Sequence, residues 1–215
     1  MYNWALEMDW PELEYNPASG ITNPDPGQVV TRSLSDDEIR TFWRWLVTHP
    51  RLERSTKEVF KGILLTALRP GEVLFTEASE VRGEWLHVQA KRMKNRKPHL
   101  VYLSPTARSV FSRCDRFGWP LVFPFPAAAT ALCMSLRRGF DHKTHRLECA
   151  PFTPKDLRRT VATNLGEMGY SMAQVGMILS HTDSSVTAVY NLAQQRELRR
   201  EMLQAWERRL LEIVK

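Results

Sequence analysis

Residues 153–190 read TPKDLRRTVATNLGEMGYSMAQVGMILSHTDSSVTAVY, and this stretch decides the fold. It opens with Thr and Pro, which favour the first turn of a helix, and we expect this helix to end at Gly169. Ser171 predicts the start of a second helix that ends near His181, and a third, short helix is expected to hold Tyr190. The stretch therefore predicts a helical region.

Capping and periodicity predict a further helix at the start of the compact domain, which we place near Arg32. Ser35 and Glu38 form the sequence pattern of a capping box, so a helix should begin there and run to about His49. Apolar residues then recur at helical spacing: Ile39, Phe42, Trp43, Leu46 and Val47.

The next helix is predicted to cover about residues 54–68, where apolar side chains again share one face. Pro70 and Gly71 follow, and neither residue continues a helix well. The helix must therefore stop by Arg69, and we expect Arg69 to lie at a helix end.

One region of the chain has the pattern of β-strands. Two short runs, Glu84 to Ala90 and Pro98 to Leu103, flank the basic segment from Lys91 to Lys97, which predicts a hairpin with a charged tip. Further helices are expected at about 105–117 and 127–139. The predicted fold class is therefore mainly α with a small antiparallel β-sheet or hairpin.

The two ends of the chain differ from its middle. Residues 1–31 hold a short helical tract and a linker rich in Asn, Pro and Gly, and we interpret them as a remnant of an upstream domain. Residues 32–194 would form the compact domain, and residues 195–215 an amphipathic helix. That helix has two interpretations, packing on its own domain or docking on a neighbouring copy, and the sequence leaves both open.

Charge is distributed unevenly along the 215 residues. Residues 1–50 hold 3 basic and 8 acidic side chains, whereas residues 51–215 hold the remaining 27 basic and 16 acidic ones. Such a basic region favours a polyanion, most often nucleic acid. No apolar run approaches the roughly 20 residues that span a bilayer. Three cysteines in no metal-ligand spacing favour reduced thiols, so we expect a soluble, cytoplasmic protein with no membrane contact.

Four separate parts of the chain supply residues that can carry chemistry. They are Arg69 in TALRPGE, Lys94 in the hairpin tip, Lys155 and Arg158 in TPKDLRRT, and His181 with Tyr190 in LSHTDSSVTAVY. Each of them alone fits a surface ion pair or a solvated charge better than a site. A phosphodiester, however, gains negative charge in its transition state, and arginine binds such oxygens with a planar fork. Arg69 and Arg158 suit that role, and Tyr190 is the candidate nucleophile.

The whole set, in this order, resembles the tyrosine recombinase family of the phage-integrase kind. The shared features are an Arg three residues before a Glu, a Lys in a β-hairpin, a DLRRT helix start, and a His followed nine residues later by a Tyr. The resemblance covers about Arg32 to Tyr190, and its most specific part runs from DLRRT to the tyrosine. It implies that residues 32–194 have the tyrosine recombinase catalytic-domain fold.

The same resemblance implies a function, which is site-specific integration or excision of a mobile element. Double-stranded DNA would be cleaved at attachment sites through a 3′-phosphotyrosyl bond to Tyr190 and then rejoined. The working complex would be a tetrameric synapse on DNA, and the isolated fragment would be a monomer. No cofactor or metal is expected, because the covalent bond stores the ester energy and the sequence has neither a GxxxxGK[ST] loop nor a cluster of acids for two Mg²⁺ ions.

The remaining roles combine this resemblance with general chemistry. The departing 5′-oxygen needs a proton, and we assign Lys94 as the general acid. Lys94 lies eight residues before Tyr102, where the family usually has Pro, whereas Lys91 and Lys97 are rivals for the same role. His181 would hydrogen-bond the scissile phosphate or exchange protons with the nucleophile.

Besides Tyr102, two positions near the expected site depart from the family pattern. Lys155 stands where the family usually has His, so it would act either as a base or only as added positive charge. Ser180 stands where Gly is expected before the family histidine. We expect DNA contacts from basic side chains of the hairpin tip and of the DLRRT helix: Lys91, Arg92, Arg96, Lys97 and Arg159.

Three other functions fit these residues less well than a recombinase does. A type IB topoisomerase shares the covalent chemistry, but the DLRRT and SH…Y segments argue against it. A DNA-binding regulator without catalysis is disfavoured because all the candidate catalytic residues are retained together. A protein-interaction scaffold would leave the basic hairpin tip unexplained.

Overall fold

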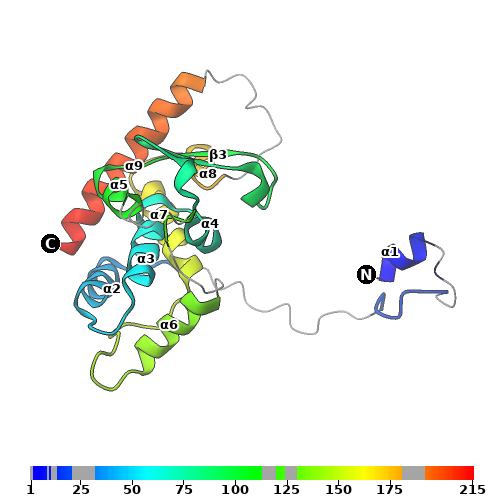
Figure 1. Cartoon of the computed structure of the whole chain (residues 1–215), viewed down its shortest axis with the longest axis horizontal. Helices are drawn as coiled ribbons and strands as arrows, with labels where there is room; N and C mark the ends of the chain where they lie inside the picture. Colours follow the sequence, from blue (N-terminus) through cyan, green and yellow to red (C-terminus); the bar gives the residue numbers. More distant parts are fainter. Residues whose placement is uncertain are drawn as a thin grey trace. The chain divides into compact units, whose positions relative to one another are not determined.

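The computed structural model describes residues 2–8, 10, 14–20, 32–112, 120–123, 130–180 and 192–215. The chain divides into two compact units, Met1–Val30 and Thr31–Lys215. In the first unit the structure describes one helix, α1 (Tyr2–Glu7), and a turn at residues 17–20. The second unit contains the other described helices and strands (Figure 1).

Local sequence sets the ends of the first two helices of the second unit. α2 (Asp36–Thr48) begins after Ser35, whose side chain accepts from the Glu38 N–H while the Glu38 carboxylate accepts from the Ser35 N–H. The predicted capping box is therefore confirmed. α3 (Arg54–Thr66) ends at Ala67, which adopts a left-handed conformation with φ of 55°. α3 is buried along most of its length, because it lies at the centre of the unit.

The chain starts a new helix directly after Arg69, and this refines the predicted position of that residue. The last residue of α3, Thr66, lies three residues before Arg69, and Arg69 is the N-cap of the short helix α4 (Pro70–Leu74). Pro70 occupies the first helical position, where a missing N–H is tolerated. The Glu72 carboxylate accepts from the Arg69 N–H at 2.9 Å. Arg69 therefore lies at the start of a helix and not at the end of the preceding one.

The β region is a three-stranded antiparallel sheet in the order β1-β2-β3. Its elements are β1 (Val81–Arg82), β2 (Trp85–Val88) and β3 (His99–Tyr102), with the single-turn helices η1 (Ala78–Glu80) before β1 and η2 (Ala90–Arg92) after β2. The predicted hairpin is confirmed, because β2 and β3 pair from Trp85–Tyr102 to Val88–His99. β1 is an addition that the sequence did not predict, and it turns into β2 at Gly83, whose φ of 61° favours glycine.

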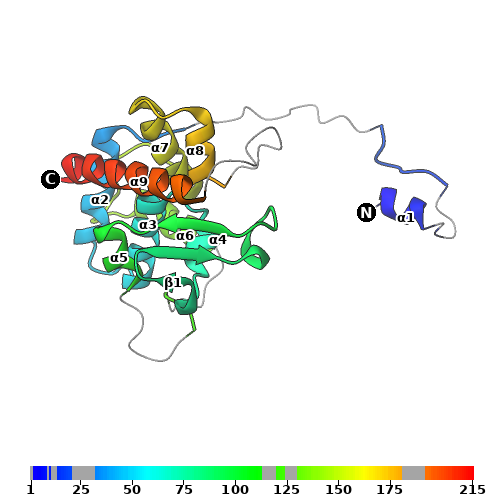
Figure 2. The same ribbon diagram turned by 90° about the horizontal axis from the view of Figure 1, so that it is seen from above.

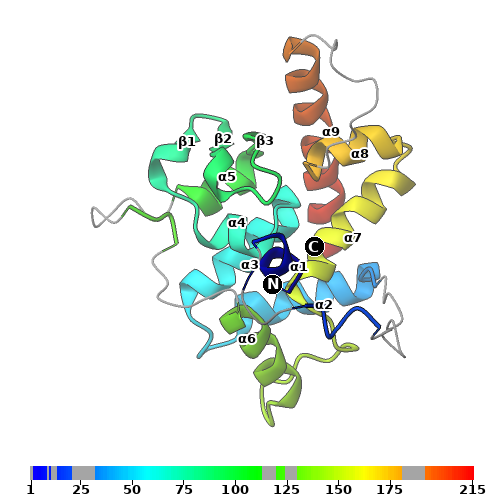
Figure 3. The same ribbon diagram turned by 90° about the vertical axis from the view of Figure 1, so that its right-hand side faces the viewer.

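The other helices of the second unit surround α3. They are α5 (Pro105–Phe111), α6 (Thr130–Asp141), α7 (Pro154–Glu167), α8 (Met172–Ile178) and α9 (Leu192–Val214). α3 packs against α4, α5, α7 and α9, so it lies at the centre of these helices. α9 runs beside β3 on one side and α7 on the other (Figures 2 and 3).

The C-terminal helix α9 packs on its own unit. Trp206 is fully buried, and its Nε1 donates to the Leu64 carbonyl of α3 at 2.6 Å. The Glu207 carboxylate accepts from the Thr106 N–H at 2.7 Å, which satisfies a donor at the start of α5. The rest of its apolar face is also buried: Met202, Leu203, Leu210 and Ile213. In this single chain the apolar face of residues 202–213 is buried on its own unit, and docking on a neighbouring copy stays a prediction.

Candidate active site

Two arginines that are far apart in sequence meet at one buried carboxylate. Arg69 Nη1 donates to Glu72 Oε1 at 2.8 Å, and Arg158 Nη1 lies 3.8 Å from Glu72 Oε2. The Glu72 side chain is only 5% exposed, whereas the Arg69 side chain is 32% exposed. The guanidiniums of Arg69 and Arg158 therefore share one site, and Arg69 presents its cation to the surface.

Arg158 is held in place from α7 by carbonyl groups of two other segments. Its Nη1 donates to the Ala67 carbonyl at 2.8 Å, and its Nη2 donates to the Leu179 carbonyl at 2.5 Å. Burial, together with the positive charge of Arg69, lowers the pKa of Arg158 to about 10, although Glu72 opposes this change. Because that pKa is still well above neutrality, Arg158 remains a cation at the site.

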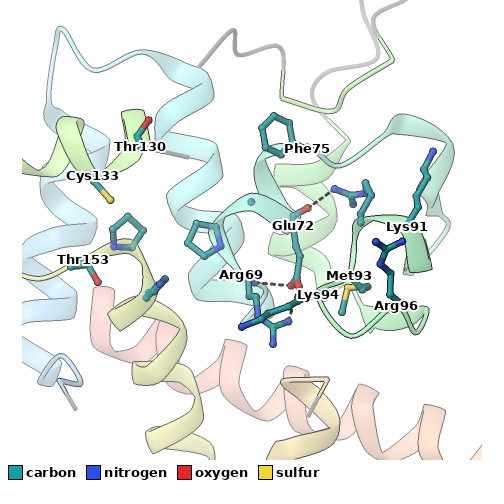
Figure 4. Close-up of a pocket in the computed structure, with 15 residues that line it drawn as sticks. Arg69, Glu72, Phe75, Lys91, Met93, Lys94, Arg96, Thr130, Cys133 and Thr153 are labelled. Carbon is teal, nitrogen blue, oxygen red and sulfur yellow. Dashed lines mark hydrogen bonds and ion pairs between the residues drawn. The ribbon is translucent and has the colours of Figure 1, made fainter. Parts of the chain in front are cut away.

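A cavity of about 1050 Å³ opens beside this arginine pair. Its walls come from α4, the loop between β2 and β3, α6 and the start of α7, and they include Arg69, Phe75, Lys91, Lys94, Arg96, Thr130, Cys133, Thr153 and Lys155. Figure 4 shows Thr130 and Cys133 on one side of the cavity, Lys91 and Arg96 on the other, and Arg69 between them. The fold thus gathers Arg69, Lys94 and Lys155 around a single space.

The loop that carries Lys94 is anchored at its base by Arg92. The Arg92 guanidinium donates to both oxygens of the buried Glu80 carboxylate, at 3.1 and 2.6 Å, and to the Glu72 carbonyl at 3.1 Å. Met93 is buried next to it, whereas Lys94 is exposed. Arg92, which the sequence assigned to DNA contact, is therefore used here to hold the loop.

The last predicted DNA contact, Arg159, lies on α7 next to Arg158. Its Nη1 donates to Asp156 Oδ1 at 2.6 Å, and its side chain is 45% exposed. This pair stands at the start of α7, where a carboxylate is stabilised by the free N–H groups of the helix. The exposed part of the Arg159 guanidinium still faces solvent.

Three side chains dock on the last carbonyls of α8 and the residues that follow it. His99 Nε2 lies 3.0 Å from the Ile178 carbonyl, Arg158 binds the next carbonyl, and Asn95 Nδ2 donates to the Ser180 carbonyl at 3.1 Å. The carbonyls at a helix C-terminus have no partner within the helix, so these contacts satisfy them. The end of α8 is thereby fixed to the hairpin and to α7.

His99 has a defined protonation state in this arrangement. Arg199 Nη1 lies 3.2 Å from its Nδ1, and because arginine can only donate, Nδ1 accepts and the proton resides on Nε2. Burial first, and then the charge of Arg199, lower the pKa of His99 to about 3. His99 is therefore a neutral donor to α8.

Two of the predicted catalytic residues, His181 and Tyr190, lie outside the described residues, as does the short helix predicted around Tyr190. The structure reaches Ser180 on one side of them and resumes at Leu192 on the other. Their roles therefore stay predictions.

Sequence reasoning did not single out Asn95, His99 or Phe75. Asn95 is a neutral residue within a segment whose lysines and arginines were the candidates for DNA contact. His99 lies in a predicted strand, where nothing in the sequence indicates a special role. Phe75 is 43% exposed in the cavity wall, and a lone phenylalanine gives no signal of that exposure. Glu72 was visible in the RPGE motif, but its contact with Arg158 was not.

Within the residues that the structure describes, no group of three or more His, Cys, Asp or Glu side chains is arranged to hold a metal ion. No helix in the same residues has both the length and the apolar character that a membrane span requires.

The fold and the cationic site together define a class, the catalytic domains of tyrosine recombinases. Residues 127–197 match the phage integrase family, a range that includes Lys155 and Arg158 but not Arg69 or Lys94. Prophage integrase IntZ of Escherichia coli (strain K12) is 31% identical over 182 residues, which are 78% of this chain and 42% of that protein. This chain therefore spans less than half the length of that relative.

Solved structures show the same fold at low sequence identity. A lambda integrase tetramer bound to a Holliday junction has a TM-score of 0.62 at 13% identity, over 87% of this chain and 57% of that one. The integrase from mycobacterium phage Brujita has a TM-score of 0.63 at 16% identity, over 100% of this chain and 73% of that one. The chain belongs to the tyrosine recombinases of the phage integrase family.

Proposed function

We propose that this chain performs the strand cleavage and rejoining of a site-specific DNA recombinase, with Tyr190 as the nucleophile. One observation carries the proposal: Arg69 and Arg158 meet at Glu72, and Arg69 lines a cavity together with Lys94 and Lys155. Fixed cations of this kind stabilise the charge that a phosphodiester gains in its transition state. Their convergence from α4, α7 and the hairpin supports a phosphate site.

The proposed reaction is a transesterification. The Tyr190 phenolic oxygen bonds to phosphorus while the bond from phosphorus to the 5′-oxygen breaks, which leaves a 3′-phosphotyrosyl ester. The phenolic proton passes to a nearby base, for which His181 and Lys155 are the candidates, and Lys94 supplies a proton to the departing 5′-oxygen. Attack by a second 5′-hydroxyl reverses these steps and rejoins the strand.

The partners follow from the same proposal. The substrate is double-stranded DNA, contacted through phosphates by the exposed cations of the hairpin tip, namely Lys91, Arg96 and Lys97. The solved lambda integrase is a tetramer on a Holliday junction, and XerH was captured with its difH substrate. By analogy we propose a tetrameric synapse for the whole protein, which would integrate or excise a mobile element in the cytoplasm.

A covalent-capture assay tests this function. The chain is incubated with a pool of nicked DNA duplexes of randomised sequence, in which cleavage next to the nick releases a short fragment and traps the enzyme. Denaturant-resistant adducts are then isolated and their DNA is sequenced. Tyr190→Phe should abolish the adduct, whereas Tyr170→Phe, which removes a phenol that contacts Glu201 on the surface, should keep it. An undiminished adduct with Tyr190→Phe, or no adduct with the unmodified chain, would contradict the proposal.

The general acid has its own test. A DNA substrate with sulfur in place of the 5′-bridging oxygen has a leaving group that needs no proton. Lys94→Ala should therefore slow cleavage of ordinary DNA and spare the sulfur substrate. Lys91→Ala and Lys97→Ala are matched controls from the same loop, and selective rescue of one of them in place of Lys94→Ala would reassign the acid.

A further inference from the structure

The side chain of Asn95 connects the hairpin tip to the end of α8. Its Nδ2 donates to the Ser180 carbonyl at 3.1 Å and to Ser180 Oγ at 3.3 Å. At its other end, Oδ1 accepts from the Lys97 N–H at 3.2 Å, which closes a local turn. Asn95 therefore uses both ends of its amide, one within the tip and one across to a segment 85 residues away.

Ser180 has an unusual backbone conformation at this contact. Its φ is 51°, in the left-handed region where glycine is favoured and where other residues are uncommon. This explains why glycine was expected at the position. In this chain the Ser180 hydroxyl accepts a hydrogen bond from Asn95, and a glycine at this position would have no side chain to accept it. Asn95 and Ser180, with its left-handed backbone, thus form a hydrogen-bonded pair.

Both residues of the pair adjoin proposed catalytic groups in the sequence. Asn95 directly follows Lys94, and Ser180 directly precedes His181. Arg158 donates to Leu179, the residue before Ser180, so the same end of α8 is also tied to the arginine site. A backbone outlier held by side chains beside such groups is typical of functional positions.

We propose that Asn95 is a positioning residue, which holds the general acid Lys94 in a fixed place relative to the end of α8. This inference rests on the proposed function, and in particular on the role of Lys94. The proposed role is to act through Lys94 and not on a reacting atom. Its hydrogen bonds to Ser180 fix the tip, and a misplacement of about 1 Å at a reacting group can cost about 100-fold in rate.

The test compares two substrates that differ in one atom. A duplex recovered from the covalent-capture assay is prepared with either oxygen or sulfur at the 5′-bridging position, and its single-turnover cleavage is measured. Asn95→Ala should slow cleavage of the oxygen substrate by about 10- to 100-fold and leave cleavage of the sulfur substrate unchanged. In the double variant, Lys94→Ala with Asn95→Ala, cleavage should be no slower than in Lys94→Ala alone.

Two further variants separate positioning from folding. Gln89→Ala removes a similar amide from the same hairpin, one that contacts Glu77 and not α8, and it should leave both rates unchanged. Asn95→Ser can still accept from the Lys97 N–H but is too short to reach Ser180. It should therefore show the same selective slowing of the oxygen substrate as Asn95→Ala, and it replaces Asn95→Ala in the test if that variant unfolds. Thermal unfolding of each variant reports whether it is folded.

The outcomes distinguish this inference from the proposed function. Equal slowing of the oxygen and sulfur substrates by the Asn95 variants, or additive effects in the double variant, would overturn the positioning role. Unchanged rates in both Asn95 variants would overturn it as well. Failure of the proposed function shows itself differently, because the unmodified chain would then form no adduct, or Tyr190→Phe would still form one.

Discussion

Replacing Glu72 by glutamine should destabilise the domain, because the two arginines would lose their shared counter-charge. Glu72 accepts from the Arg69 side chain at 2.8 Å and from the Arg69 N–H at 2.9 Å, and it lies 3.8 Å from Arg158. Glutamine has one acceptor oxygen, so one of these donors would face an NH₂ group.

The size of the effect follows from burial. Removing one partner of a buried ion pair costs about 3–5 kcal/mol, and the partial exposure of Arg69 favours the lower end, about 3 kcal/mol. For a domain of this size that corresponds to a fall of about 6–12 °C in the midpoint of thermal unfolding. The pKa of Arg158 should also fall further, because Glu72 raises it.

Circular dichroism at neutral pH measures the midpoint directly. The matched control is Glu77→Gln, which breaks a surface pair with Lys91 at 3.2 Å, where the Lys91 side chain is 63% exposed. Water and salt screen such a pair, so the control should change the midpoint little. If Glu72→Gln were as mild as Glu77→Gln, Glu72 would not organise the arginine site.

Three more predictions concern pH, the hairpin loop and the core. The pKa of His99 is about 3 in the fold, below its ordinary value of about 6.5, so the unfolded chain binds a proton first as the pH falls. The free energy of unfolding should therefore drop by up to about 1.4 kcal/mol per pH unit between about pH 6.5 and about pH 3. Urea titrations should show a shallower drop for His99→Gln. Lys91→Ala should reduce the slope of log DNA affinity against log salt by about 0.9 without changing stability. Arg92→Ala should instead cost about 3–5 kcal/mol of folding free energy. A loss of stability in Lys91→Ala together with unchanged stability in Arg92→Ala would contradict both roles. Gly139→Ala should cost about 1–3 kcal/mol by thermal unfolding, because the new Cβ would lie 2.6 Å from Trp45 Cζ2, and an unchanged midpoint would mean that the indole can move aside.

Local signals predicted most of the helices because their ends depend on a few neighbouring residues. Ser35 with Glu38 defined the start of α2, and Thr153 with Pro154 defined the start of α7. The hairpin followed from two short runs of β-strand pattern on both sides of its basic segment, and these runs pair as β2 and β3. β1 was missed because a two-residue strand has no periodicity of its own and exists only through its pairing with β2.

The candidate site was predicted as a set of residue types but not as a set of contacts. The sequence indicated that Arg69 and Arg158 would bind phosphate, that Lys94 would be the general acid, and that Arg92 would contact DNA like its basic neighbours in the hairpin tip. The structure separates Arg92 from those neighbours, because its side chain is only 11% exposed and pairs with the buried Glu80, while Lys91, Arg96 and Lys97 are exposed. No local pattern encodes this difference, since Glu80 lies on another element.

By itself, the amino-acid sequence determined the helical fold class, the hairpin and the chemistry available to the chain, because capping, periodicity and charge are properties of short segments. Only the tertiary structure decided which of those charges meet. The contact of Arg158 with Glu72, and that of Asn95 with Ser180, each join residues more than 80 positions apart. Such contacts depend on how α3, α7 and α8 pack around one core, and packing is a property of the whole domain.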